Sequence, residues 1–226
     1  MTSPPERLLL IHGFGSNFHH GWADVGWVDI LSDFGVEAPA IDLPGHGAWS
    51  PITDAEEYGD IPEKLFASLP PKAPYSAVGF SMGSQMLVRM AIAHPEAFDR
   101  IVLMGMGDSV FDPLATEPLR EGLSAPRDFT NVAMEVFHRM IEQNDDNLAS
   151  LLCFLEQPRS AVTEEDLAKI TCPVLVILGE RDEAEFTRLL GALHDVRFVA
   201  LPGVDHFATP SDFKAIDETL RFFGIS

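Results

Sequence analysis

Short apolar runs of strand length alternate along this chain with longer segments in which apolar and polar residues follow helical spacing. The apolar runs occupy residues 7–11, 36–41, 75–79, 101–106, 174–179 and 197–201. Helical segments are expected at 22–34, 56–69, 82–94, 187–193 and 211–223. Continuous apolar strands joined by helices are typical of a parallel sheet covered on both faces. The pattern therefore predicts a three-layer α/β fold with a mostly parallel sheet of about six strands.

One long segment, 108–172, interrupts this alternation and does not resemble a single crossover helix. Apolar residues recur in it at positions i, i+3, i+4 and i+7 over 129–141, and a second apolar stretch follows at 148–155. Thr163 and Asp166 have the spacing of a capping box that opens another short helix. We expect this segment to be an inserted helical cap. The core would then consist of residues 1–107 and 173–226.

Composition restricts the class of protein. With 226 residues, of which 46% are hydrophobic, the chain can bury a full core. Its formal net charge of -20 argues against nucleic acid and against anionic membranes as partners, because both require clustered basic residues. No signal-peptide pattern and no apolar run of membrane-spanning length is present. Cys153 and Cys172 have no short-spaced partners, so we expect reduced thiols and a cytoplasmic protein.

The segment Gly79-Phe80-Ser81-Met82-Gly83 is the most informative part of the chain. It places Ser81 on a tight turn between an apolar strand and a helix, where flanking glycines permit a backbone conformation that larger residues would obstruct. A serine in this position is the nucleophile of a nucleophile elbow. We therefore take Ser81 as the candidate catalytic nucleophile.

A serine nucleophile needs a base and an acid that orients the base. Asp182 follows the strand at 174–179, and His206 follows the strand at 197–201. Catalytic groups of open α/β sheets gather at the carboxyl ends of the strands, so these two side chains can converge on Ser81. Glu180, Glu183 and Asp108 also follow strands. Asp108 is the main rival for the acid, and Asp182 is the favoured assignment.

The loop His12-Gly13-Phe14-Gly15-Ser16 directly follows the first apolar strand. Its small residues allow backbone N–H groups to face a substrate. We expect the N–H groups of Phe14 and Met82 to form an oxyanion hole, since Met82 is the residue after the nucleophile.

Taken together and in order, these motifs resemble the α/β-hydrolase family, and in particular its small, capped serine esterase-like members. The blocks that carry the resemblance are 12–16, 42–47, 79–83, 94–96, 172–182 and 205–206, which run nearly end to end. The resemblance implies Ser81 as nucleophile, Asp182 as acid and His206 as base. The chain departs from the family in two respects: too few residues precede Arg7 for the two antiparallel strands that often come first, and Ser84 stands where glycine is often found.

The resemblance implies a serine hydrolase that cleaves a small, largely apolar carboxylic ester through an acyl-enzyme, with no metal and no cofactor. Trp22, Phe111 and Phe137 are the expected pocket residues. One alternative is a carbon–carbon bond hydrolase or lyase acting on a diketone-like acid, which would require cationic residues for the carboxylates of the substrate. Another is a non-catalytic receptor that binds a small molecule on the same scaffold. The oligomeric state is not predicted.

Overall fold

A computed structural model describes residues 3–144, 146–182 and 184–225. Its described residues form a five-stranded sheet in which every neighbouring pair of strands is parallel. The strands are β1 (Leu8–Ile11), β2 (Tyr75–Phe80), β3 (Phe98–Met104), β4 (Val174–Gly179) and β5 (Val196–Leu201), in the order β1-β2-β3-β4-β5. The predicted parallel α/β architecture is confirmed.

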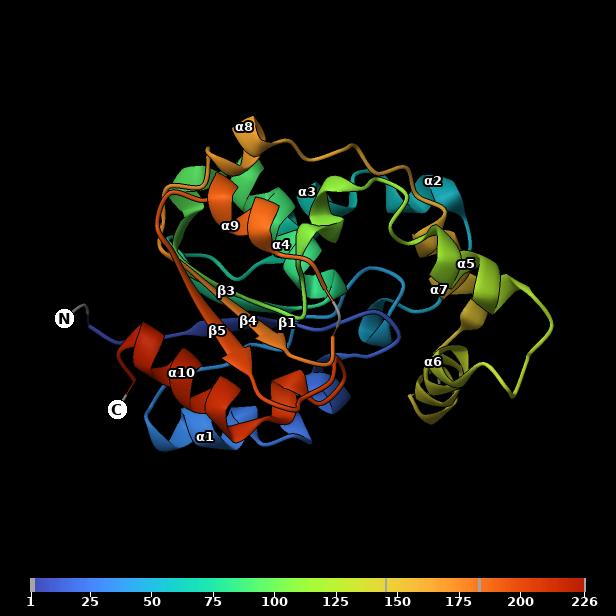
Figure 1. Ribbon diagram of the computed structural model, residues 1–226, viewed down its shortest axis with the longest axis horizontal. Helices are drawn as coiled ribbons and strands as arrows, with labels where there is room; N and C mark the ends of the chain where they lie inside the picture. The colour runs from blue at the N-terminus through green and yellow to red at the C-terminus, as the bar shows by residue number, and fades with distance from the viewer. Residues whose placement is uncertain (1–2, 145, 183, 226) are drawn as a thin grey trace.

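Helices cover both faces of the sheet (Figure 1). Helices α3 (Ile61–Ser68), α4 (Met82–Ala93) and α9 (Thr187–Ala192) lie on one face, and α1 (Trp27–Asp33) and α10 (Phe213–Phe223) lie on the other. Side chains of β1 alternate between the two layers: Leu9 and Ile11 join the first core, whereas Leu8 and Leu10 join the second. Both faces of β1 to β4 are largely buried, which explains their continuous apolar runs.

The strand predicted at 36–41 does not form. Only Glu37 pairs with the edge strand, donating its N–H to the Glu6 carbonyl at 3.0 Å and accepting the N–H of Leu8 at 2.9 Å. The next rung of a parallel ladder would require the N–H of residue 39, which is a proline and has none. The expectation of six strands is therefore corrected to five strands and an isolated bridge.

Two predicted helices are divided. In place of one helix at 56–69 the chain forms α2 (Ala55–Tyr58) and α3, because Gly59 adopts a φ of 55° and Asp60 caps a new helix. The segment at 22–34 contains the π-helical turn η1 (His19–Ala23) followed by α1. Short 3-10 turns complete the core. They are η2 (Gly47–Trp49), η3 (Pro95–Ala97) and η5 (Thr209–Ser211).

The long segment between β3 and β4 is helical. It contains η4 (Asp108–Phe111), α5 (Glu117–Ser124), α6 (Val132–Gln143), α7 (Leu148–Leu155) and α8 (Glu164–Leu167). Helices α5, α6 and α7 lie together beyond one end of the sheet, whereas α8 packs with α4 and α9 (Figure 1). The predicted capping box is confirmed, because the Thr163 and Asp166 side chains each accept the backbone N–H of the other residue.

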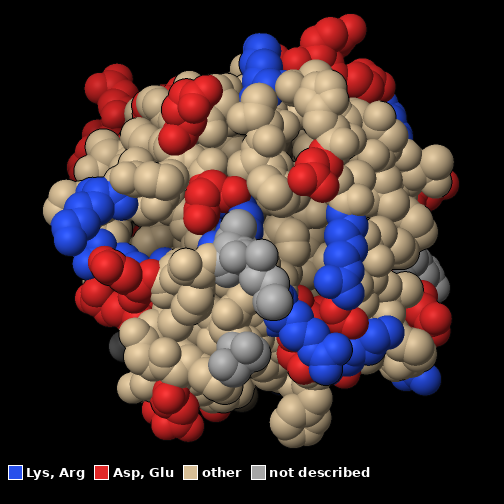
Figure 2. All heavy atoms as spheres, turned by 90° about the vertical axis from the view of Figure 1, so that its left-hand side faces the viewer, with Lys and Arg blue, Asp and Glu red and all other residues tan. Residues whose placement is uncertain are grey.

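The surface at the end of the molecule that carries both termini bears acidic and basic side chains interspersed with each other (Figure 2). Cys153 and Cys172 are free and buried. Among the described residues, no helix combines the length and the apolar composition that crossing a membrane requires.

Candidate active site

Ser81 occupies the turn between β2 and α4 with a φ of 52° and a ψ of -113°. This backbone conformation is sparsely populated for a residue with a side chain and persists only where the surroundings impose it. The Ser81 N–H is held by the Met104 carbonyl of the neighbouring strand at 2.8 Å. Ser81 is therefore fixed in the strained conformation that a nucleophile elbow requires.

Gly79 and Gly83 flank the turn and are required there, because backbone atoms of other segments approach both residues closely. A Cβ on Gly79 would lie 2.6 Å from the Ser84 nitrogen, and one on Gly83 would lie 2.1 Å from the Ile11 carbonyl oxygen. Real Cβ atoms do not approach backbone atoms so closely. The missing side chains let α4 pack directly on β1 and β2.

Replacing Gly83 with alanine is expected to lower the free energy of unfolding by about 3 kcal/mol or more, because the obstructing atom belongs to the backbone of the central sheet. Urea unfolding measures the effect. Gly191→Ala in α9 is the matched control, since nothing lies within 4 Å of the added methyl group. That variant should be neutral or slightly stabilised; an equally mild effect at Gly83 would contradict the packing argument.

Ser84 replaces the glycine often found at this point in the family without disturbing the elbow. Its fully buried hydroxyl lies 2.7 Å from the Gly79 carbonyl and 2.9 Å from the Met104 carbonyl. These carbonyls belong to β2 and β3. The hydroxyl therefore ties the first turn of α4 to both strands.

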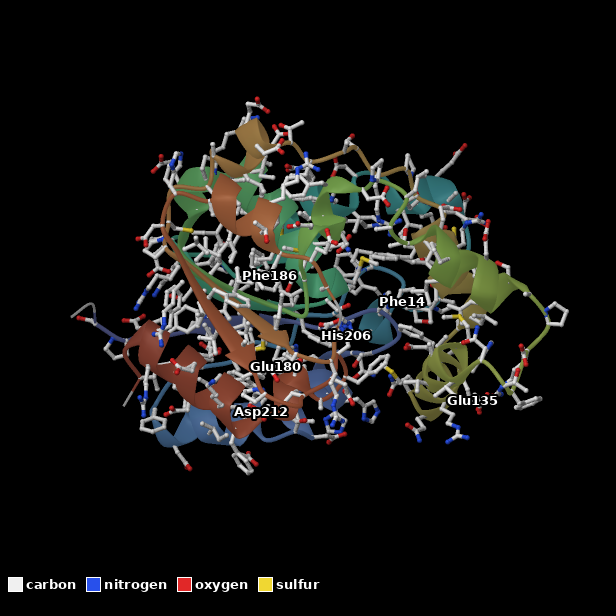
Figure 3. All side chains as sticks on the ribbon, viewed as in Figure 1. Phe14, Glu135, Glu180, Phe186, His206 and Asp212 are labelled. Carbon is white, nitrogen blue, oxygen red and sulfur yellow. The ribbon has the colours of Figure 1, made fainter. Side chains whose placement is uncertain are left out.

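The structure brings the three predicted side chains together. His206 Nε2 lies 3.0 Å from Ser81 Oγ, and His206 Nδ1 lies 2.9 Å from both carboxylate oxygens of Asp182. The Asp182 side chain is only 11% exposed, and that of His206 is 26% exposed. All of these distances permit hydrogen bonding and proton transfer. Figure 3 shows His206 and Phe14 near each other, between the sheet and helices α5–α7.

The rival acid Asp108 has a different partner. Its carboxylate accepts the backbone N–H groups of Arg188 at 3.2 Å and Leu189 at 2.7 Å, in the first turn of α9. Glu180 accepts the Gly203 N–H at 3.2 Å. Glu183 lies outside the described residues. Of the described carboxylates considered for the acid, Asp182 is the one that hydrogen-bonds to His206.

The loop after β1 is braced by His12, whose side chain is buried. Its Nε2 accepts the Leu43 N–H at 2.9 Å, so its Nδ1 carries the proton and donates to the Gly13 carbonyl at 2.8 Å. Phe14 lies in the following turn, and Met82 is the first residue of α4, where helix N–H groups have no intrahelical partner. The oxyanion role of these two amides stays a prediction.

A second buried histidine, His46, packs against this loop. Its ring contacts those of Phe14, His12 and Phe154, with centroids 5.1 to 5.4 Å away. Burial is the largest cause that lowers the pKa of His46 to about 3, and repulsion from His12, when that ring is protonated, adds to it. Burial likewise lowers the pKa of His12, although the nearby Asp42 opposes this shift. Both imidazoles are therefore neutral near pH 7.

The buried His46 predicts that stability falls as the pH drops below about 6.5. The unfolded imidazole takes up a proton near pH 6.5, whereas the folded one stays neutral down to about pH 3. Each pH unit between these values should cost about 1.4 kcal/mol. Urea unfolding at several pH values should show a shallower acid dependence for His46→Leu than for the wild type. Leucine at the exposed His194 is the control; equal dependences for His46→Leu and the wild type would contradict the prediction.

A cavity of about 160 Å³ opens beside Ser81 and His206. Apolar side chains dominate its wall: Phe14, Trp22, Val25, Phe80, Phe137, Met140, Phe207 and Pro210. Its polar wall residues, apart from Ser81 and His206, are His12, Ser16, His20 and Ser211. Of the described residues that line it, none is lysine or arginine. The cavity is therefore small and largely apolar, with neither lysine nor arginine among its described lining residues.

Two of the three expected pocket residues, Trp22 and Phe137, line this cavity. The expectation for Phe111 is wrong: it lies in η4 beneath Arg188, whose guanidinium carbon is 3.7 Å from the ring centroid. Phe80 and Phe207 were missed, although both are sequence neighbours of catalytic candidates. Their adjacency to Ser81 and His206 was the sequence signal that could have predicted them as pocket residues, because a residue beside a catalytic group often borders its pocket.

A model of the alpha/beta hydrolase family matches residues 8–217. The chain is 30% identical over 151 residues to a 2-hydroxy-6-oxononadienedioate/2-hydroxy-6-oxononatrienedioate hydrolase of Pseudomonas sp., covering 61% of this chain and 49% of that protein. It therefore spans about half the length of that relative.

Two further similarities have broader coverage. The chain is 28% identical over 206 residues to the pimeloyl-(acyl-carrier protein) methyl ester esterase of Nitrosomonas europaea, covering 80% of this chain and 79% of that protein. The crystal structure of NosK from Streptomyces actuosus superposes with a TM-score of 0.68 at 24% identity, covering 98% of this chain and 97% of that one. The latter shows a shared fold.

Proposed function

Because the chain belongs to the alpha/beta hydrolase family, we propose that it is a serine hydrolase that cleaves a small, largely apolar carboxylic ester through an acyl-enzyme. The supporting observation is the continuous hydrogen-bonded series from Ser81 through His206 to Asp182, beside a small apolar cavity. A base within hydrogen-bonding distance of a hydroxyl, itself oriented by a carboxylate, is the arrangement that activates a serine for acyl transfer.

In the proposed cycle, His206 Nε2 removes the proton of Ser81 as the Oγ attacks the ester carbonyl. The oxyanion accepts hydrogen bonds from the N–H groups of Phe14 and Met82. The protonated His206 then donates its proton to the departing alkoxide, leaving an acyl-enzyme. His206 next deprotonates a water that attacks the acyl carbonyl, and Ser81 regains its proton as the acid is released. The Asp182 carboxylate accepts a hydrogen bond from the Nδ1–H group of His206. This keeps the proton on Nδ1, so that Nε2 is free to act as the base.

The cavity supports a neutral, compact substrate. Its volume of about 160 Å³ leaves room for a short acyl group, and its wall is mainly aromatic and aliphatic. A substrate carboxylate placed there would be desolvated without a lysine or arginine partner among the described wall residues, which is costly. An uncharged ester avoids this cost.

A second candidate is carbon–carbon bond hydrolysis, favoured by the similarity to the 2-hydroxy-6-oxononadienedioate hydrolase of Pseudomonas sp.. The substrate named for that relative is a dicarboxylate. The absence of lysine and arginine among the described cavity-lining residues favours the ester. A higher kcat/KM for a 2-hydroxy-6-oxo-dienedioate than for any simple ester would favour carbon–carbon bond hydrolysis over ester hydrolysis.

The proposal is tested by two measurements on the wild-type protein. Turnover of p-nitrophenyl acetate, butyrate and octanoate should be measurable, with preference for the shorter acyl groups. A fluorophosphonate should label one residue, which peptide mass spectrometry should locate at Ser81. If the protein neither turns over esters nor becomes labelled, yet binds a small hydrophobic molecule, it is a receptor and the proposal is wrong.

A further inference from the structure

Two arginine side chains border a second cavity that shares no described lining residue with the first. It measures about 330 Å³ and lies between α4, the start of α3 and the segment that follows α7. Arg89 projects from α4, seven residues and thus about 10 Å along the helix from Met82. Arg159 comes from the segment after α7. The cavity is therefore distinct from the one beside Ser81.

Neither guanidinium has a carboxylate within 4.0 Å among the described residues. Arg89 donates through Nη1 to the Ser160 carbonyl at 2.9 Å, and its Nε is buried without a hydrogen-bond partner among the described atoms. Arg159 donates through Nη1 to Thr116 Oγ1 at 2.9 Å and to the Leu155 carbonyl at 3.1 Å. The chain carries 35 acidic residues against 15 lysines and arginines, so carboxylates are not in short supply. The cavity nonetheless leaves two positive charges without an ion-pair partner.

Burial makes these charges costly. It lowers the pKa of Arg159 to about 10, with a further contribution from the neighbouring charge of Arg89, while Glu117 opposes the shift. Burial also lowers the pKa of Arg89, and Asp60 opposes that shift. An anion between the two guanidiniums would compensate both charges.

The rest of the wall indicates what kind of anion fits. Ile61, Met86 and Pro158 contribute apolar surface, and the volume is about twice that of the cavity at Ser81. Asp60 also borders the cavity, although its carboxylate is engaged in capping α3 through the Glu63 N–H at 3.2 Å. The negative charge of Asp60 disfavours a dianion more than a monoanion. A carboxylate is thus preferred to a phosphate.

We propose that this cavity binds a small organic carboxylate, with the carboxylate between Arg89 and Arg159 and a short apolar chain against Ile61, Met86 and Pro158. Guanidinium groups match a carboxylate through paired N–H donors. Such a ligand links α4 to the segment that leads out of α7. The site does not depend on turnover at Ser81.

Isothermal titration of the 226-residue chain with sodium hexanoate tests the proposal. Arg89→Gln and Arg159→Gln should each weaken binding about tenfold or more, because a charge-assisted hydrogen bond is lost. Arg221→Gln is the matched control: it removes the same charge from α10, where the side chain is paired with Asp217. Hexanol, which lacks the charge, should show no arginine-dependent binding.

Stability and activity are measured on the same variants. Arg159 also contacts carbonyls at the end of α7, so thermal unfolding without ligand establishes that each variant is folded. Ester turnover should be unchanged by Arg89→Gln. Hexanoate binding that persists in both arginine variants, or inorganic phosphate that binds more tightly than hexanoate, would overturn the proposal. Arginine-dependent binding by a protein without ester turnover would refute the hydrolase proposal and leave this one standing.

Discussion

Replacing Ser81 with alanine is expected to lower kcat for p-nitrophenyl butyrate by roughly 10,000-fold to 1,000,000-fold. The hydroxyl that His206 contacts at 3.0 Å is the atom that becomes acylated in the proposed cycle, and alanine has no substitute for it. Residual rate would come only from the oxyanion donors and from binding. Steady-state kinetics together with fluorophosphonate labelling measure the loss, and labelling should disappear entirely.

Ser211→Ala is the matched control for this variant. Ser211 lines the same cavity, but its hydroxyl donates to the Ala208 carbonyl at 3.0 Å. Removing it should change kcat only a few-fold, with labelling intact. A Ser81→Ala protein that kept its turnover, or a Ser211→Ala protein that lost it, would show that the nucleophile is misassigned.

Replacing Asp182 with asparagine is expected to lower kcat about 10,000-fold. An asparagine amide group can donate to His206 Nδ1, which favours the tautomer whose Nε2 already carries a proton and cannot act as the base. The size is unchanged, so the fold should remain intact. Comparison of kcat across pH for the variant and the wild type separates this effect from simple unfolding.

Asp108→Asn is the corresponding control, because Asp108 is the rival acid. Its carboxylate accepts two N–H groups in the first turn of α9 and, among the described residues, has no hydrogen bond to Ser81, Asp182 or His206. The variant should keep kcat within a few-fold and lose about 1 kcal/mol of stability, because the asparagine side chain has one acceptor oxygen for the two N–H groups. If Asp108→Asn abolished turnover and Asp182→Asn did not, the assignment of the acid would be reversed.

Local patterns along the chain were sufficient to predict the parallel α/β fold and its nucleophile turn. Apolar runs of strand length require burial on both faces, and this requirement is visible in each segment alone. The spacing of Gly79, Ser81 and Gly83 is an equally local signal, because it indicates that α4 packs closely against β1. The periodicity did not reveal that Pro39 would end the ladder at the edge of the sheet, although the missing N–H was visible in the sequence.

Contacts between segments far apart in the chain could be assigned only from the tertiary structure. The loops after β3 and β4 each carry a candidate carboxylate. The packing of these loops places Asp182 in hydrogen-bonding contact with His206 and Asp108 in hydrogen-bonding contact with the first turn of α9. The same holds for Phe111, buried under Arg188, and for Phe207, which faces the cavity. The meeting of Arg89 and Arg159 likewise depends on how α4 packs against the segment after α7. Side-chain direction in loops follows from packing between elements, and no local spacing rule encodes it.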